Sequence, residues 1–138
     1  MTAHALIVSP LYVGVCALIF VALAARVIGL RGRRRVNLGH GGHADLETAI
    51  RVHGNFAEYV PLALLVIVLV EAAGFDRFWI HGLGTALVVG RLLHGRGLSR
   101  ENQPSVGRVA GMTLTFAVLI VGGVLLIARF IEIAAAAR

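Results

Sequence analysis

The chain has 138 residues, of which 58% are hydrophobic and only 14% charged, and its mean hydropathy is +0.86. Water-soluble domains carry far less apolar material, so lipid is the expected solvent. All 13 basic residues are arginine, and the formal net charge is +6. These arginines stand in short loops and at the ends of apolar stretches, where they fix orientation in a membrane, so no nucleic-acid partner is expected.

Four apolar stretches follow one another, and each is long enough to cross a membrane. A helix needs roughly 20 mainly apolar residues to cross a hydrocarbon layer about 30 Å thick. Because backbone N–H and C=O groups cannot stay unpaired in lipid, such stretches must be helical. The expected spans are about residues 5–29, 46–73, 78–98 and 106–133. Residues 1–138 are therefore predicted to form one all-α domain, an integral membrane four-helix bundle with up-down-up-down topology.

The first predicted span, 5–29, lacks the positive n-region of a secretory signal and is interpreted as a retained helix. An arginine cluster at 31–35 follows it directly, and a glycine-rich loop comes next. Asp45, at the end of this loop, is expected to cap the second helix by accepting bonds from its free N–H groups. His40 and His43 in the loop lack a third ligand, so no metal site is predicted.

The second predicted span, 46–73, would be about 42 Å long at 1.5 Å per residue, which exceeds the hydrocarbon thickness. Its polar first half must therefore protrude or be shielded by protein. Pro61 lies inside this helix, removes one backbone hydrogen bond and predicts a local kink. Glu71 and Glu132 stand near the ends of their helices and are expected to be hydrated.

The third predicted span carries Gly82, Ala86 and Gly90 four residues apart, a spacing that allows close helix packing in membranes. The loops before and after this span differ in charge, because most arginines near the helix ends fall after the first and third spans. Cytoplasmic loops carry an excess of arginine, so these two loops are predicted to face the cytoplasm. Both termini would then lie outside.

Polar side chains gather on one face of the second helix. Arg51, Asn55 and Glu58 stand at i, i+4 and i+7, with Tyr59 beside them. Ionisable side chains within spans are costly, so they usually face protein or a wet cavity. This face is therefore a candidate site.

Polar groups of two further helices are expected at the same depth. Arg91 and His94 stand at i and i+3 of the third helix, and Arg108 opens the fourth. One interpretation is an internal salt-bridge network in which Glu58 neutralises an arginine. Yet the three arginines outnumber the one carboxylate. Buried positive charge that no carboxylate balances is stabilised by a bound anion. A small cytosolic ligand bearing carboxylates would satisfy it.

Two segments, RVHGNFAEYVPLALL at 51–65 and GRLLHGRG at 90–97, are similar to a known family. The first adds Tyr59 and Pro61 to the polar face. With four spans, a glycine-rich first loop and Arg108 opening the last span, the chain resembles the superfamily of membrane-associated proteins in eicosanoid and glutathione metabolism (MAPEG). The resemblance covers nearly the whole chain and is closest to bacterial-type members like microsomal glutathione S-transferase.

The resemblance implies a homotrimer in which glutathione, the co-substrate, binds between neighbouring subunits in a site open to the cytosol. The residues that match the glutathione-binding positions are Arg51, Asn55, Glu58, Tyr59, Arg91 and His94. Arg108 matches the arginine that stabilises the thiolate in catalytic members, and it is the candidate catalytic residue. One of Arg31 or Arg34 matches the first-helix arginine of the family.

The function implied is that of a glutathione transferase or peroxidase acting on lipophilic electrophiles, a detoxification activity of the bacterial inner membrane.

Two departures from the family pattern favour an alternative function. Family enzymes often carry a tyrosine where this chain has Leu98, and some have a serine where it has Val109. The alternative is a non-catalytic member that binds lipid headgroups or a partner membrane protein. A transporter is disfavoured, because no inverted repeat or broken-helix pair is present.

Overall fold

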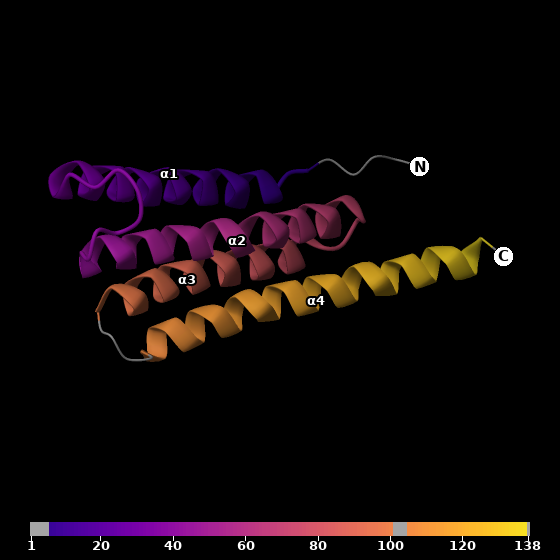
Figure 1. Cartoon of the computed structure of the whole chain (residues 1–138). Coiled ribbons are helices and arrows are strands. Elements are labelled where there is room, and N and C mark those ends of the chain that lie inside the picture. Colours follow the sequence, from indigo (N-terminus) through magenta and orange to yellow (C-terminus); the bar gives the residue numbers. More distant parts are fainter. Residues whose placement is uncertain (1–5, 101–104, 138) are drawn as a thin grey trace.

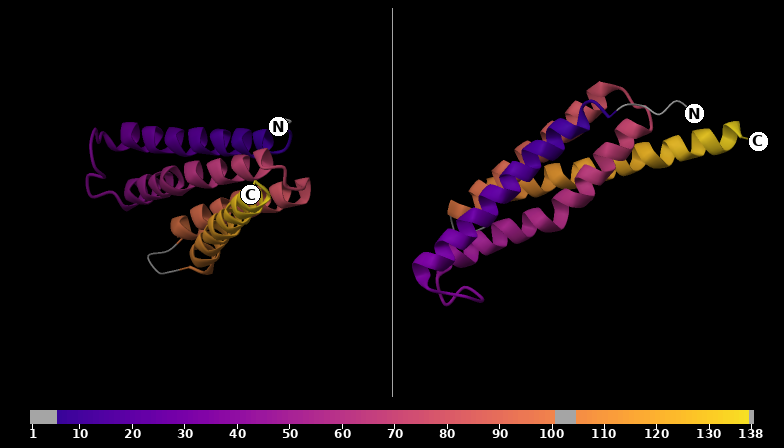
Figure 2. Two further views of the ribbon diagram at one scale, coloured as in Figure 1. Left: turned by 90° about the vertical axis from the view of Figure 1, so that its right-hand side faces the viewer. Right: turned by 90° about the horizontal axis from the view of Figure 1, so that it is seen from above.

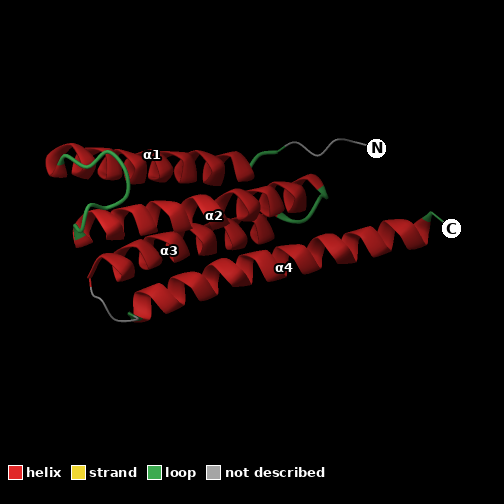
Figure 3. Ribbon diagram, viewed as in Figure 1, coloured by secondary structure: helices red, strands yellow, loops and turns green. Residues whose placement is uncertain are grey.

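The computed structural model describes residues 6–100 and 105–137, and for residues 98–100 it describes the backbone alone. Four helices make up the described chain: α1 (Ser9–Arg34), α2 (Ala44–Ala72), α3 (Arg77–Arg100) and α4 (Val106–Ala136). They run up, down, up and down, so both termini lie at one end of the bundle (Figures 1 and 3). We name this the terminal end and the opposite end the arginine end. The predicted all-α four-helix bundle is confirmed.

The arginine cluster belongs to helix α1. The first span was predicted to end at residue 29, so the helix is longer than predicted. Arg31, Arg33 and Arg34 lie in the last turn of α1, where cations interact favourably with the helix dipole. Arg35 ends the helix in the left-handed region at φ 53°, and its N–H bonds back to the carbonyl groups of Arg31 and Gly32. The cluster therefore extends α1 beyond its apolar part.

The start of α2 differs from the prediction. His43, and not Asp45, is the N-cap residue, and its side chain makes no capping bond. Asp45 lies inside the first turn, where its carboxylate accepts from the N–H of Leu46 and pairs with Arg34 at 2.9 Å. The prediction that Asp45 caps α2 was wrong, because the acidic side chain ties α2 to the end of α1 instead.

The closest helix contact joins α3 and α4. A Cβ atom on Gly111 would collide with the carbonyl oxygen of Gly90 and with His94. Nearer the arginine end, a Cβ on Gly97 would collide with the backbone of Gly107 and Arg108. Of the predicted small-residue stripe, Gly90 therefore lies at the contact with α4, whereas a Cβ atom added at Gly82 would meet nothing within 4 Å. Small residues let these two backbones approach.

Helices α2 and α3 form the centre of the bundle. Both contact α1 and α4, whereas α1 and α4 do not pack on each other within the described chain. Fully buried side chains from all four helices fill the interior, among them Cys16, Leu46, Ile67, Leu87 and Val118. The right-hand view of Figure 2 shows α2 bending about midway along its length, in agreement with the kink predicted for Pro61.

Helices α1, α2 and α4 are long and apolar enough to cross a membrane. Helix α3, which is more polar, runs alongside them, and its crossing as the third span stays a prediction. The C-terminal part of α4 extends past the other helices (Figure 1). It exposes Ile127, Phe130 and Ile131, which suits contact with lipid or protein rather than water.

At the terminal end, Glu71 of α2 is only 6% exposed, so the expectation that it would be hydrated was wrong. Its carboxylate accepts from the backbone N–H groups of Ile7, Val8 and Ser9 at 2.7 to 2.9 Å. The first N–H groups of a helix have no partner within the helix, and an anion there is favourable. Glu71 therefore fixes the start of α1. Glu132 is exposed, as expected, and pairs with Arg129.

Candidate functional site

A cavity of about 650 Å³ opens near the arginine end, between α2, α3 and α4. We name it the polar cavity. Its walls contain five of the seven predicted site residues: Arg51, Asn55, Glu58, His94 and Arg108, together with Ile50 and Gly54. The spacing on α2 therefore does turn one polar face toward the other helices. The first turn of α4 adds Arg108, whose helix starts at the N-cap Ser105.

Arg91, the sixth predicted site residue, does not line the polar cavity but contacts Asn55, which does. It is only 4% exposed, and its guanidinium donates to the side-chain oxygen of Asn55, to Thr115 Oγ1 at 3.2 Å and to Met112 Sδ at 3.9 Å. All three partners are neutral. Arg91 thus joins α3 to the polar face of α2 and to α4, while its charge lacks a carboxylate partner among the described residues.

The predicted salt-bridge network does not form. Within the described residues the ion pairs are Arg34–Asp45 and Arg129–Glu132, and neither includes Glu58. Glu58 is exposed, as are Arg51 and Arg108, so these side chains remain accessible to a ligand. The interpretation in which Glu58 neutralises an arginine was wrong, because the one carboxylate of the cavity stays separate from its arginines. The positive surplus therefore persists in the folded chain.

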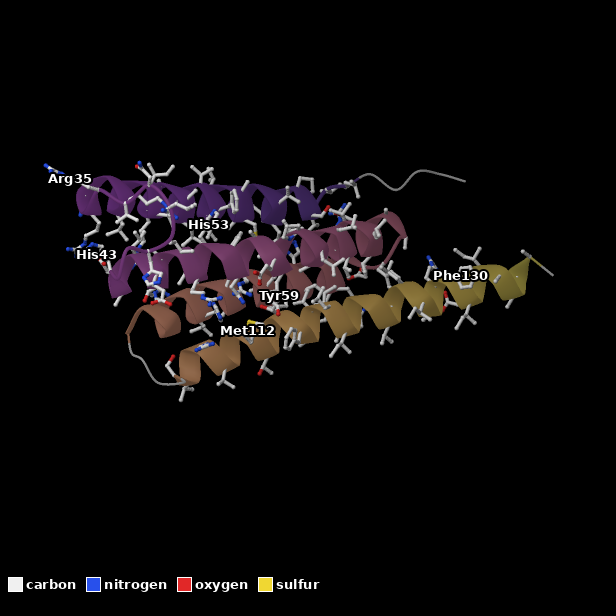
Figure 4. All side chains as sticks on the ribbon, viewed as in Figure 1. Arg35, His43, His53, Tyr59, Met112 and Phe130 are labelled. Atoms are coloured by element: carbon white, nitrogen blue, oxygen red, sulfur yellow. The ribbon has the colours of Figure 1, made fainter. Side chains whose placement is uncertain are left out.

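Tyr59 is the seventh predicted site residue, and it does not line the polar cavity. It packs edge-on against Phe116 of α4, with 5.7 Å between the ring centroids. Figure 4 labels Tyr59 next to the region where α2 faces α4, with Met112 nearby. In the single chain Tyr59 therefore supports the contact between α2 and α4.

Thr115 is a site residue that the sequence did not reveal. Its side chain is fully buried, donates to the carbonyl oxygen of Gly111 at 2.9 Å and accepts from Arg91. A threonine that bonds four residues back along its own helix is common and carries no functional signal. Only the close crossing of α3 and α4 brings it to Arg91.

The sequence departs from the family pattern at two positions, Val109 and Leu98. Val109 follows Arg108 and is 59% exposed, so its side chain lies on the outside of α4. It does not line the polar cavity. Leu98 lies outside the described side chains.

Three apolar helices and a polar cavity near one end, lined by Arg51, Arg108 and Glu58, are the features of a multi-pass integral membrane protein with polar groups gathered between its helices. The sequence model of the MAPEG family matches residues 9–128, so the chain belongs to the MAPEG family. The relatives found include inner membrane protein YecN of Escherichia coli, from strain K12 and from O6:H1 strain CFT073. Each is 35% identical over 113 residues, which cover 82% of this chain and 85% of the relative.

Proposed function

We propose that the polar cavity binds glutathione and that the protein transfers it to lipophilic electrophiles, or uses it to reduce them. The observation that carries the proposal is the uncompensated charge of Arg91, set behind the accessible Arg51 and Arg108. Glutathione carries two carboxylates, and a guanidinium binds a carboxylate through two parallel hydrogen bonds. Membership of the MAPEG family supports the choice of this anion over others.

The lining residues suggest a division of roles. Arg51 would bind a carboxylate, and Asn55, already held by Arg91, would orient the peptide backbone. Glu58 is the cavity's carboxylate and suits the ammonium group of the tripeptide. His94 and Arg91 would close the inner wall. Tyr59 belongs to this proposal only through the family pattern.

Arg108 is the proposed catalytic residue. A guanidinium next to a thiol lowers the thiol's pKa and makes the nucleophilic thiolate available near neutral pH. In transfer, the thiolate sulfur forms a bond to the electrophilic carbon while the leaving group departs with its electron pair. In peroxidase chemistry, two thiols become one disulfide while a lipid hydroperoxide becomes an alcohol and water. The protein would contribute by holding thiolate and electrophile together at the lipid boundary.

The proposal includes a homotrimer in the bacterial inner membrane, with the arginine end facing the cytoplasm and both termini outside. The exposed apolar groove that includes Gly82, Ala86 and Leu114 offers a surface on which a second copy could pack. The arginines gathered at the ends of α1 and α3, opposite the termini, favour this orientation.

The test is equilibrium binding of glutathione to the purified protein in detergent, with ultraviolet absorbance of the thiolate followed during titration. We expect saturable binding with a thiolate signal. Arg108→Leu should abolish the signal and Arg51→Leu should weaken binding about tenfold, which is the effect of losing one good charge pair. Arg33→Leu, which removes an exposed arginine outside the cavity, is the matched control. No binding at millimolar glutathione, with the helical circular dichroism intact, would refute the proposal.

The alternative is a non-catalytic member that binds lipid headgroups or a partner membrane protein. Val109, which stands where some family members carry serine, favours it. Glutathione binding without a thiolate signal would mean that the cavity holds the tripeptide but does not activate it. Competition of glutathione by anionic lipid would support a headgroup in the polar cavity.

A further inference from the structure

An apolar groove with a volume of about 460 Å³ lies between α1 and α2, about midway along the bundle. We name it the α1–α2 groove. Its walls are Val13, Cys16, Ala17 and Phe20 of α1 with Phe56, Ala57, Val60, Pro61 and Leu64 of α2. None of these residues is charged, and none of them lines the polar cavity. The groove is therefore a separate place for a ligand.

Small side chains keep this groove open toward the membrane. Ala17 of α1 and Ala57 of α2 both lie on its wall and are both exposed, so the groove is accessible from the outside of the bundle. Pro61, at the bend of α2, belongs to the same wall. Because apolar walls gain nothing from water, the occupant of such a groove is drawn from the lipid phase.

Three aromatic rings close the end of the groove that is nearer the arginine end. The ring centroid of Phe20 lies 4.8 Å from that of His53 and 6.3 Å from that of Phe56. Phe20 and Phe56 are wall residues, and His53 stands one helical turn before Ala57 on α2. Figure 4 labels His53 between α1 and α2. The apolar groove thus ends at a polar ring.

His53 carries a polar atom that the protein leaves unpaired. Its Nε2 is buried and has no hydrogen-bond partner among the described residues. Buried polar atoms are almost always paired in native proteins, so this nitrogen indicates a partner from outside the chain. A neutral imidazole nitrogen donates to a carbonyl oxygen or accepts from a hydroxyl group, according to its tautomer. The occupant therefore needs a polar head at this end.

We propose that the α1–α2 groove binds a prenylated quinone of the membrane, a neutral lipid with a flat carbonyl-bearing ring and an isoprenoid tail. A ring carbonyl would accept from His53 Nε2. The flat ring would pack on Phe20 and Phe56, since aromatic groups stack with ring centres roughly 4.5 to 7 Å apart. The tail would run along Val60 to Leu64, which lies about 16 Å from His53 at 1.5 Å per residue.

The uncharged wall favours this lipid over the other lipids of a membrane. A phospholipid or a fatty acid would bring a phosphate or a carboxylate against a wall without a cation, and an unpaired charge there is costly. A plain hydrocarbon would fill the apolar part but would leave His53 Nε2 without a partner. A neutral head with a carbonyl group meets both requirements.

The test measures how decylubiquinone, a short-tailed quinone, protects Cys16 from N-phenylmaleimide in detergent. Cys16 is the single cysteine of the chain and lies on the groove wall, so its labelling rate reports occupancy of this groove. We expect saturable protection. His53→Leu should raise the half-protecting concentration about fivefold, the effect of one lost hydrogen bond. His40→Leu, which removes an exposed loop histidine, is the matched control.

Native mass spectrometry gives a second measurement. The protein should retain added decylubiquinone, and Ala57→Trp, which fills the groove, should lose it. Ala22→Trp changes an exposed alanine of α1 outside the groove and should retain the quinone. Circular dichroism checks that each variant remains helical.

Four results would overturn the proposal. Decylubiquinone without effect on Cys16 labelling would show that the groove does not bind it. Equal protection by hexadecane would show an apolar surface without head recognition, and equal effects of His53→Leu and His40→Leu would remove the role of the unpaired nitrogen. Dissociation of an oligomer by Ala57→Trp, with bound quinone unchanged, would show that a second copy covers the groove. His53→Leu should leave glutathione binding unchanged, so this proposal and the proposed function fail independently.

Discussion

The two ends of the bundle differ in whether the protein supplies partners that balance a buried charge. At the terminal end, the carboxylate of Glu71 accepts from the backbone N–H groups of Ile7, Val8 and Ser9 at the start of α1. At the arginine end, the guanidinium of Arg91 is equally buried but binds an amide, a hydroxyl and a thioether. One charge is matched by the protein, and the other is not.

This difference indicates which buried charge stabilises the fold and which one is available to a ligand. A buried charge that the protein itself satisfies holds two segments together and needs nothing else. A buried positive charge whose partners are all neutral has no counter-ion in the protein, and an anionic ligand can supply one. The terminal end should therefore govern stability, and the arginine end should govern binding. Four substitutions test this division, from the largest expected effect to the smallest.

Glu71→Ala should destabilise the protein by about 3 kcal/mol, since it leaves the buried N–H groups of Val8 and Ser9, at the start of α1, without their anion. The measurement is thermal unfolding in detergent. Glu132→Ala removes an exposed carboxylate near the same end and is the matched control, for which little change is expected. Equal effects of the two substitutions would contradict a structural role for Glu71.

Gly111→Ala should cost about 2 kcal/mol, because the added methyl group would force the α3 and α4 backbones apart at Gly90. Separation of these helices should also weaken glutathione binding, since Arg91 and Thr115 would lose their contact. Gly123→Ala, on the same helix with no neighbour within 4 Å, is the control. Unchanged unfolding and binding in Gly111→Ala would show that the close approach is unimportant.

Arg91→Met should change the free energy of unfolding by less than about 1 kcal/mol, because a buried ion without an ionic partner adds little to stability. Glutathione affinity should nevertheless fall about tenfold, which corresponds to about 1.4 kcal/mol. Binding titration and thermal unfolding of the same preparation check both parts. A large loss of stability with unchanged affinity would assign Arg91 to the structure and reverse the comparison.

Tyr12→Phe gives the smallest expected effect, about 1 kcal/mol of stability. The hydroxyl bonds to His81 Nδ1 at 2.9 Å and to Thr85 Oγ1 at 3.0 Å, and so links α1 to α3 at the terminal end. Glutathione binding should be unaffected. A change in ligand affinity without a change in melting temperature would show that the two ends are coupled.

Much of the site could be predicted because helix geometry is regular. Arg51, Asn55 and Glu58 share a face at their spacing, and the fold turns that face into a cavity wall. Thr115 could not be found, because nothing in its local sequence distinguishes it from a threonine that bonds only its own helix. Tyr59 was grouped with the polar face but packs on Phe116, since adjacent positions on a helix point in different directions.

Apolar length and composition by themselves determined the four helices, their order and the end at which the arginines gather, because a lipid solvent leaves the backbone few alternatives. The motif on the second helix determined the family. Only the tertiary structure decided which charges are compensated. Glu71 meets the start of α1 from more than 60 residues away, and Arg91 meets Thr115 where Gly90 and Gly111 let two backbones approach. Such pairs depend on contacts between helices, which periodicity along one helix does not encode.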